Sequence, residues 1–254
     1  TPVEGHEATG TNTWGPTQDA SITNVVSGTD ILTVRGVYGN GVTVLDHPGA
    51  AVNCQNPPPG SADLKVSASS GLAQGDIVLV SNCSNAAVFQ ITHINTAGGF
   101  DNVVHNTGGG NPGNGSKCLG GNYVGGQILR IATFTYYIRL NAAGRPALYR
   151  LSRGTAEELV ENVENMQITY GVDTDGDRAV DEYRTANNVA DWNSVRSVRV
   201  RLLLISPEDN LVSPPQIYRY TDTDGDGLPD PVTATDNRLR YVFTSTVGVR
   251  NLLP

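Results

Sequence analysis

The chain has 254 residues, of which 38% are hydrophobic and 17% are charged, and its 29 glycines and 14 prolines favour short strands joined by turns over packed helices. Its net charge of −8 disfavours phosphate backbones and anionic membrane surfaces as partners, so we expect no nucleic-acid binding. No segment approaches the roughly 20 consecutive apolar residues that a membrane-spanning helix needs, and no signal peptide opens the sequence.

In the first half of the chain the pattern predicts scattered strands. Residues 1–29 show little periodicity, and we expect them to form an extended lead-in to one β-rich domain at residues 30–254. Strands are predicted at 31–35, 76–81 and 87–92, the last two as a hairpin around a polar turn. The Gly- and Asn-rich segment 106–126 has the composition of a surface loop.

In the second half the pattern predicts a hairpin, a helix and three further strands. The hairpin joins strands at 127–140 and 146–153, and further strands are predicted at 167–172, around 197–204 and at 241–250. Thr155 with Glu158 matches a capping box, and Leu159, Val163 and Met166 follow at helical spacing, which predicts one short helix. The fold class expected is therefore α+β, dominated by antiparallel sheet.

Alternation along the last two strands predicts a sheet with one buried face. Val198, Val200, Leu202 and Leu204 share one side of their strand, opposite Ser197, Arg199 and Arg201. In the final strand we expect an inward-facing set made of Tyr241, Phe243, Val247 and Val249.

Three cysteines, Cys54, Cys83 and Cys118, suit an exported protein with one disulfide, and any of the three pairings is open. The odd thiol is either buried or paired with a cysteine outside this sequence.

The acidic residues are concentrated, since nine of the 25 lie in two short loops. In the loop 222–230, carboxylates stand at the first, third, fifth and ninth positions and Gly227 at the sixth, where a calcium-binding turn needs a glycine. Calcium takes six to eight oxygen ligands, and a backbone carbonyl near Leu228 would add one. The first-choice ligands are Asp222, Asp224, Asp226, Leu228 and Asp230.

The loop 173–182 keeps the same acidic spacing but has Arg178 at the sixth position. Its second-choice ligands are Asp173, Asp175, Asp177 and Asp181. For both loops the alternative is a turn in which the aspartates bond their own backbone, and magnesium suits so many carboxylates less well than calcium.

Evidence for catalysis is thin. The four histidines, His6, His47, His93 and His105, lack metal-ligand spacing, and no nucleophile elbow, phosphate-binding loop or CxxC pair is present. Trp14 and Trp192 are expected to pack in the fold. We therefore expect a protein that is not an enzyme.

Five segments of the chain, in this order, resemble the C-terminal region of PilW minor pilins of type IV pili. They are 136–139 (YYIR), 146–150 (PALYR), 158–173 (ELVENVENMQITYGVD), 197–204 (SVRVRLLL) and 242–254 (VFTSTVGVRNLLP). The likeness extends over residues 30–254 and is strongest after 127.

The resemblance implies a pilin-like antiparallel sheet domain carried by an N-terminal hydrophobic helix, which this sequence lacks. It further implies a structural subunit that initiates pilus assembly, anchored in the inner membrane of a Gram-negative bacterium before it enters the surface pilus. The implied partners are other minor and major pilins and a PilY-type tip adhesin, with membrane contact only through the missing helix.

Two readings of other classes stay open. The acidic loops and turn-rich composition also suit a secreted calcium-dependent binding module or adhesin. The other is an extracellular hydrolase, and the only features that support this reading are the inferred export and calcium binding.

Overall fold

A computed structural model describes residues 1–50, 54, 60–222 and 228–249, and confirms a β-dominated fold built from antiparallel sheets. The chain divides into two compact units, each described by itself below. Unit 1 comprises residues 1–35 and 133–254, and unit 2 comprises residues 36–132. This division differs from the single domain expected at residues 30–254, because backbone hydrogen bonds such as those from Val26 to Ile138 and from Asp30 to Met166 join the first 35 residues to the second half of the chain. No helix in the described part is long and apolar enough to cross a membrane.

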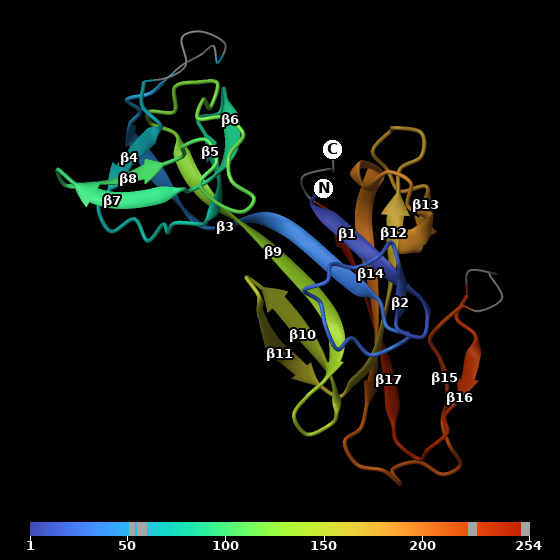
Figure 1. The fold of residues 1–254 in the computed structure, drawn as a ribbon. Helices are drawn as coiled ribbons and strands as arrows, with labels where there is room; N and C mark the ends of the chain where they lie inside the picture. The colour runs from blue at the N-terminus through green and yellow to red at the C-terminus, as the bar shows by residue number, and fades with distance from the viewer. Residues whose placement is uncertain (51–53, 55–59, 223–227, 250–254) are drawn as a thin grey trace. The chain divides into compact units, whose positions relative to one another are not determined.

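Unit 1 contains a four-stranded antiparallel sheet in the order β13, β12, β14, β17 (Figure 1). Two long strands, β3 (Ile31–Asp46) and β9 (Gln127–Leu140), begin in one unit and end in the other. The remaining strands of unit 1 are β1 (Val3–Gly10), β2 (Thr13–Gly15), β10 (Pro146–Ser152), β11 (Thr155–Glu161), β12 (Val163–Val172), β13 (Glu182–Arg184), β14 (Val195–Ile205), β15 (Ile217–Arg219), β16 (Pro231–Thr233) and β17 (Arg240–Gly248). Two single-turn 3₁₀ helices, η1 (Ala186–Asn188) and η2 (Trp192–Ser194), lie between β13 and β14.

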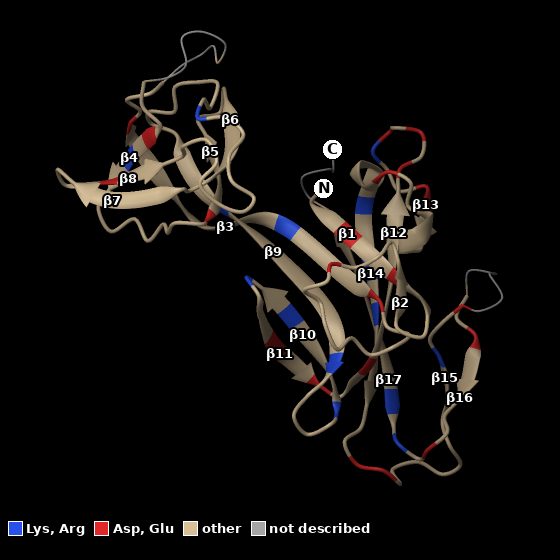
Figure 2. Ribbon diagram, viewed as in Figure 1, with Lys and Arg blue, Asp and Glu red and all other residues tan. Residues whose placement is uncertain are grey.

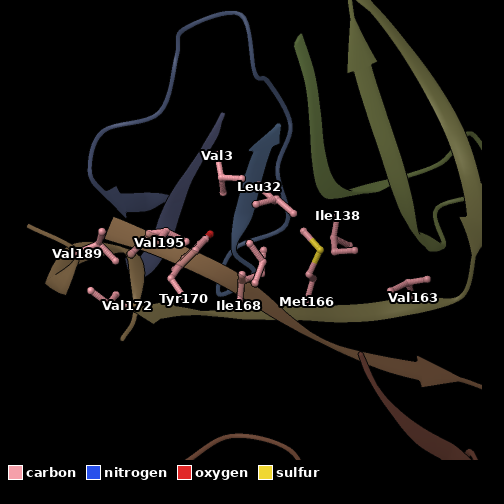
Figure 3. Packing of buried hydrophobic residues seen from close by; sticks show 12 residues of the cluster. Val3, Leu32, Ile138, Val163, Met166, Ile168, Tyr170, Val172, Val189 and Val195 are labelled. Carbon is pink, nitrogen blue, oxygen red and sulfur yellow. The ribbon is translucent and has the colours of Figure 1, made fainter. Parts of the chain in front are cut away.

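The core of unit 1 lies on one face of this sheet (Figure 3). Along β12, Met166, Ile168, Tyr170 and Val172 occupy every second position, and all four are buried. They pack with residues of β1, β3 and β9 in one cluster, including Val3, Leu32 and Ile138. Alternation with period two along β12 therefore produces this core.

The helix predicted from the Thr155 capping box is wrong, because this segment forms β11 and the start of β12. Arg153 and Gly154 both have positive φ, 50° and 77°, as in the two-residue turns that connect hairpin strands. Thr155 therefore pairs with Ser152, and β11 runs antiparallel to β10. The Glu158 carboxylate accepts a hydrogen bond from the Tyr149 hydroxyl at 3.1 Å instead of capping a helix.

The lead-in expected at residues 1–29 also differs from the structure, since β1 pairs with β3 from Val3 opposite Val34 to His6 opposite Ile31. The strand sequence VEGHEATG has one large apolar side chain, which hides its alternation. Gly5 is buried, and a Cβ built on it would lie 1.8 Å from the Tyr170 hydroxyl. Only glycine fits this position, so the sheet accepts a strand that has no apolar pattern.

Unit 2 has its own core, formed by the strands β4 (Asp63–Ser67), β5 (Ile77–Ser81), β6 (Ala86–Gln90), β7 (His93–Ala97) and β8 (Phe100–Val104) with parts of β3 and β9. The predicted hairpin is confirmed, because β5 and β6 pair antiparallel from Ile77 opposite Gln90 to Ser81 opposite Ala86. Strands β3, β4, β8 and β7 are hydrogen-bonded neighbours in that order. The loop at 106–126 carries no named strand, as its composition predicts.

The disulfide joins Cys54 to Cys118, with their Cα atoms 5.5 Å apart. It therefore ties the 106–126 loop to a residue 64 positions earlier in unit 2. Cys83 is a free thiol with an exposed side chain, which contradicts the first of the two alternatives for the odd thiol, burial.

In the inward set predicted for the last strand, Val249 is partly buried against the core, but the burial predicted for the other three residues is wrong. On β17, Tyr241 is 66% exposed, Phe243 47% and Val247 59%. These residues share a face with Leu204, Leu202 and Val198 of β14, which lie opposite them in register. The core covers that face over β12 and much of β14 but not over the outermost strand.

Candidate metal site

The first acidic loop connects the hairpin strands β12 and β13, which pair with Val172 opposite Glu182. The backbone N–H of Asp181 donates to the Val172 carbonyl at 3.0 Å and closes the loop. Gly176 and Arg178 have φ of 85° and 71°, so Arg178 takes the left-handed conformation that glycine favours. The loop thus turns at its sixth position although no glycine stands there. Figure 2 shows the acidic residues gathered on this loop.

Asp173 is the anchored carboxylate of the loop, with its side chain 1% exposed. Its Oδ1 accepts from the Gly176 N–H at 2.7 Å, and its Oδ2 accepts from the Arg178 N–H at 3.0 Å. Arg196 adds an ion pair to Oδ2 at 2.8 Å. Burial raises the pKa of the Asp173 carboxyl, but the bonds from Arg196 and the backbone outweigh burial and lower this pKa below its ordinary value.

Asp173, Asp175 and Asp177 converge, since one carboxylate oxygen from each lies within 4.8 Å of the other two. Asp173 is buried and the other two are exposed, so a cation here would be held from one side by the protein and reached from the other by solvent. Hard carboxylate oxygens are the donors that Ca²⁺ takes, which makes the set chemically suitable.

Asp181 is not part of this group. Its Oδ2 accepts from both the backbone N–H and the hydroxyl of Thr174, each at 2.7 Å, and these bonds lower the pKa of its carboxyl. Two other loop aspartates also bond the backbone, because Asp175 Oδ1 accepts from the Asp177 N–H and Asp177 Oδ1 from the Ala179 N–H. The loop therefore has both features considered from the sequence: aspartates that accept hydrogen bonds from the loop's own backbone, and a group of converging carboxylates.

The second acidic loop connects β15 and β16, which also pair antiparallel. Asp224, Asp226 and Gly227 lie outside the described residues, while Asp222, Leu228 and Asp230 lie within them. The N–H of Asp230 donates to the Thr221 carbonyl at 2.7 Å. In both loops, then, the ninth residue bonds the carbonyl that precedes the first aspartate, which gives the two loops the same closure.

The structure also contains two clusters of buried polar side chains that the sequence did not indicate, one in each unit. In unit 2, His105 is 1% exposed, its ring centroid lies 6.2 Å from that of His47, and neither ring nitrogen has a hydrogen-bond partner in the described part of the chain. His93, by contrast, is exposed on β7. The sequence offers no signal for this group, since His47 and His105 are brought together only by the pairing of distant strands.

In unit 1 the second group consists of Glu7, Asp30 and Tyr170. Asp30 accepts hydrogen bonds from the N–H groups of Ala8 and Ile168, at 3.0 and 2.7 Å. The Tyr170 hydroxyl and Glu7 Oε2 are buried without a partner among the described residues. Burial, followed by the charge of Asp30, raises the pKa of Glu7 to about 8, and burial raises the pKa of Asp30 to about 6.

Glu7→Gln is expected to raise the melting temperature more at pH 8.5 than at pH 5. Because the folded-state pKa of Glu7 lies above its ordinary value, the folded protein keeps the proton, and stability falls as pH rises from about 4.5 to about 8. Glutamine stays neutral and removes this loss. Thermal unfolding at both pH values measures the effect, with Glu4→Gln as the control, since Glu4 pairs with Arg35 at the surface. An equal shift at both pH values would contradict this assignment.

The PilW family, described as type IV pilus-assembly protein W, matches residues 135–251. Residues 135–251 form a PilW region. The match confirms the resemblance for residues 135–251, and the family that it names is one of type IV pilus assembly. No curated protein and no solved structure matches the chain.

The PilW region lies within the second segment of unit 1 and holds both acidic loops and the four-stranded sheet. Unit 2, at residues 36–132, lies outside it. The candidate metal site is thus part of the PilW region, and the disulfide and the histidine pair are not.

Proposed function

We propose that this chain is a minor pilin, a non-enzymatic structural subunit that takes part in the initiation of type IV pilus assembly. The observation that carries the proposal is the PilW match over the sheet of unit 1. Other pilins are the proposed partners, with a PilY-type adhesin at the tip, and the proposed location is the periplasm and then the surface pilus. The membrane anchor would be the N-terminal helix that the resemblance implies.

The test of this role is the loss of the gene in its host. We expect deletion to reduce the number of surface pili seen by electron microscopy, and an epitope-tagged chain to co-purify with sheared filaments. Normal piliation together with absence of the chain from sheared filaments would refute a minor pilin.

A calcium-dependent binding module or adhesin is the second candidate, favoured by the separate core of unit 2 outside the PilW region. Binding of the isolated chain to glycans or host surfaces, lost on chelation, would support it. Such binding would add to a pilus role rather than replace it if deletion also removes the pili.

We further propose that Ca²⁺ stabilises the acidic loops. The support is the convergence of Asp173, Asp175 and Asp177 and the shared closure of the two loops. A ligand that binds only the folded state stabilises it by mass action, by about 2.7 kcal/mol at a concentration 100 times its Kd. Calcium is therefore expected to raise the melting temperature, and chelation to lower it.

The variant Asp175→Asn/Asp177→Asn should lose the calcium-dependent shift that belongs to the first loop. Asp224→Ala/Asp226→Ala tests the second loop in the same way. Glu182→Gln is the matched control, because Glu182 is a neighbouring exposed acid that pairs with Arg184 and lies outside the convergent group. Calorimetric titration and melting curves read the result, and a wild-type melting curve that calcium does not move would remove the proposal.

A further inference from the structure

Among the described residues, the outermost strand of the unit 1 sheet, β17, pairs with a neighbouring strand on one side only. Its register with β14 runs without a break from Ser197 opposite Gly248 to Ile205 opposite Arg240. In an antiparallel pair, successive residues point their N–H and C=O groups alternately toward and away from the neighbouring strand. Val249 points toward β14, because its N–H donates to the Arg196 carbonyl at 2.8 Å.

At the other end of β17, Arg240 points its backbone N–H and C=O away from β14, and both groups have hydrogen-bond partners. The N–H of Arg240 donates to the Gln216 side-chain oxygen at 2.7 Å, and the Gln216 amide donates to the Arg240 carbonyl at 2.9 Å. The side chain of Gln216 thus takes the place of a neighbouring strand at this one residue. By alternation, the outward residues beyond Arg240 are Val242, Thr244, Thr246 and Gly248. Within the described part of the chain no hydrogen bond reaches the backbone groups of these four residues.

The open edge also lacks the usual protection against pairing. Natural edge strands carry charges, prolines or bulges that prevent association. The edge strand β11 of the same unit carries Glu157, Glu158 and Glu161. In contrast, β17 has the sequence RYVFTSTVG, with no charged residue after Arg240, no proline and no shift of register.

An apolar surface accompanies this edge. Tyr241, Phe243 and Val247 are exposed on the face of the sheet that carries the core. Beside Val247, an apolar hollow of about 330 Å³ lies between β14, β17, β1 and β3, with Val3, Val34 and Val200 in its lining. A further strand paired with β17 would extend the sheet beside these exposed apolar side chains.

We propose that β17 pairs antiparallel with β17 of a second copy of the chain, with Ser245 opposite Ser245. The four outward residues are placed symmetrically about Ser245, so Val242 meets Gly248 of the second copy, and Thr244 meets Thr246. Every open N–H and C=O then finds a partner, and Phe243 lies opposite Val247.

The charges permit this pairing. Although the chain carries a net charge of −8, residues 241–249 contain no charged side chain, so no like charges face one another across this paired stretch. The proposal rests on the edge itself and does not depend on a role in the pilus.

Cross-linking tests the register. Odd residues form the closer, non-hydrogen-bonded pairs, with Cα atoms about 4.5 Å apart, which lies within the range of about 4.4–6.8 Å that a disulfide spans. In a Cys83→Ser background, Ser245→Cys is expected to form a disulfide-linked dimer on mild oxidation. Tyr241→Cys is the matched control, since Tyr241 would lie opposite Val249 and two such cysteines would be far apart. Equal cross-linking of both variants, or none by Ser245→Cys, would overturn the proposal.

Sedimentation of the full chain tests the association itself. We expect a reversible dimer that Ser245→Asp weakens at least ~10-fold relative to Ser245→Asn, because like charges would stand directly opposite each other. Thr244→Pro should weaken it to a similar degree, since it removes an outward N–H and leaves the bonds to β14 intact. A wild-type chain that stays monomeric at every concentration, or variants that associate as the wild type does, would show that β17 does not pair in this way.

Discussion

Removal of the disulfide by Cys54→Ser/Cys118→Ser is expected to lower the free energy of unfolding of unit 2 by about 4 kcal/mol. The bond joins residues 64 positions apart, and in the chain-entropy model a cross-link restricts the unfolded chain more as the loop it closes becomes longer. The closed loop includes most of unit 2, from β4 to β8. We therefore expect the effect to be confined to that unit.

The two tryptophans allow the units to be followed separately. Trp14 and Trp192 both belong to unit 1, so tryptophan fluorescence reports that unit alone. Hydrogen exchange of peptides from residues 60–132, read by mass spectrometry, reports unit 2. In the double variant, denaturant titration should shift the exchange of unit 2 and leave the fluorescence transition in place.

The control for this experiment is Cys83→Ser, because Cys83 is an exposed free thiol in the same unit. It should behave as the wild type under oxidising conditions. If the double variant keeps wild-type protection in residues 60–132, the disulfide does not stabilise unit 2.

Elements with strong alternation could be predicted from the sequence, and elements that depend on distant pairing could not. The strand at β14 was predicted because its apolar residues follow a period of two, and β9 was predicted with its observed bounds as the first strand of a hairpin. The capping box at Thr155 is a local pattern, and the pairing of β11 with β10 outweighs it. The strand β1 was missed because Gly5 leaves room for the Tyr170 ring where an apolar residue would show the pattern.

In the candidate metal site, too, local features could be predicted from the sequence and contacts between distant residues could not. The spacing of the acidic residues marked both loops, with 222–230 as the first choice and 173–182 as the second. The convergence of carboxylates seen among the described residues lies in the second choice, and residues 223–227 of the first choice lie outside the described part. The anchoring of Asp173 by Arg196 was not predictable, because the sheet brings together residues 23 positions apart. The division into two units was missed as well, since β3 and β9 pass from one unit to the other without a change of composition.

The two units differ in what supports a function for them. Unit 1 holds the PilW region, the acidic loops and the open edge of β17, so the features proposed to bind cations and other subunits belong to one body. Unit 2 has a separate core and the disulfide, and it lies outside the family match. We therefore expect that the stability of unit 2 can change without a change at the open edge of β17. The pH dependence expected from His105 offers a way to test this.

Unit 2 is expected to lose about 3 kcal/mol of stability as the pH falls from about 6.5 to about 4. Burial, followed by the neighbouring His47, lowers the pKa of His105 to about 4. The folded protein thus holds His105 neutral, while the unfolded chain takes up a proton near pH 6.5, so stability is present above pH 6.5 and is lost toward pH 4. His47 acts in the same direction, because burial lowers its pKa against the opposing charges of Asp63 and Asp46.

The variant His105→Leu should remove most of this dependence, and His93→Gln should keep it, because His93 is exposed on β7 of the same unit. Hydrogen exchange of residues 60–132 at several pH values between 4 and 7.5 measures the effect without interference from unit 1. Asp101 falls outside this window, since hydrogen bonds from Thr96 and Ser70 lower the pKa of its carboxyl below its ordinary value of 3.8. If His105→Leu and the wild type lose protection equally between pH 6.5 and 4, the buried imidazole is not the cause of the acid sensitivity.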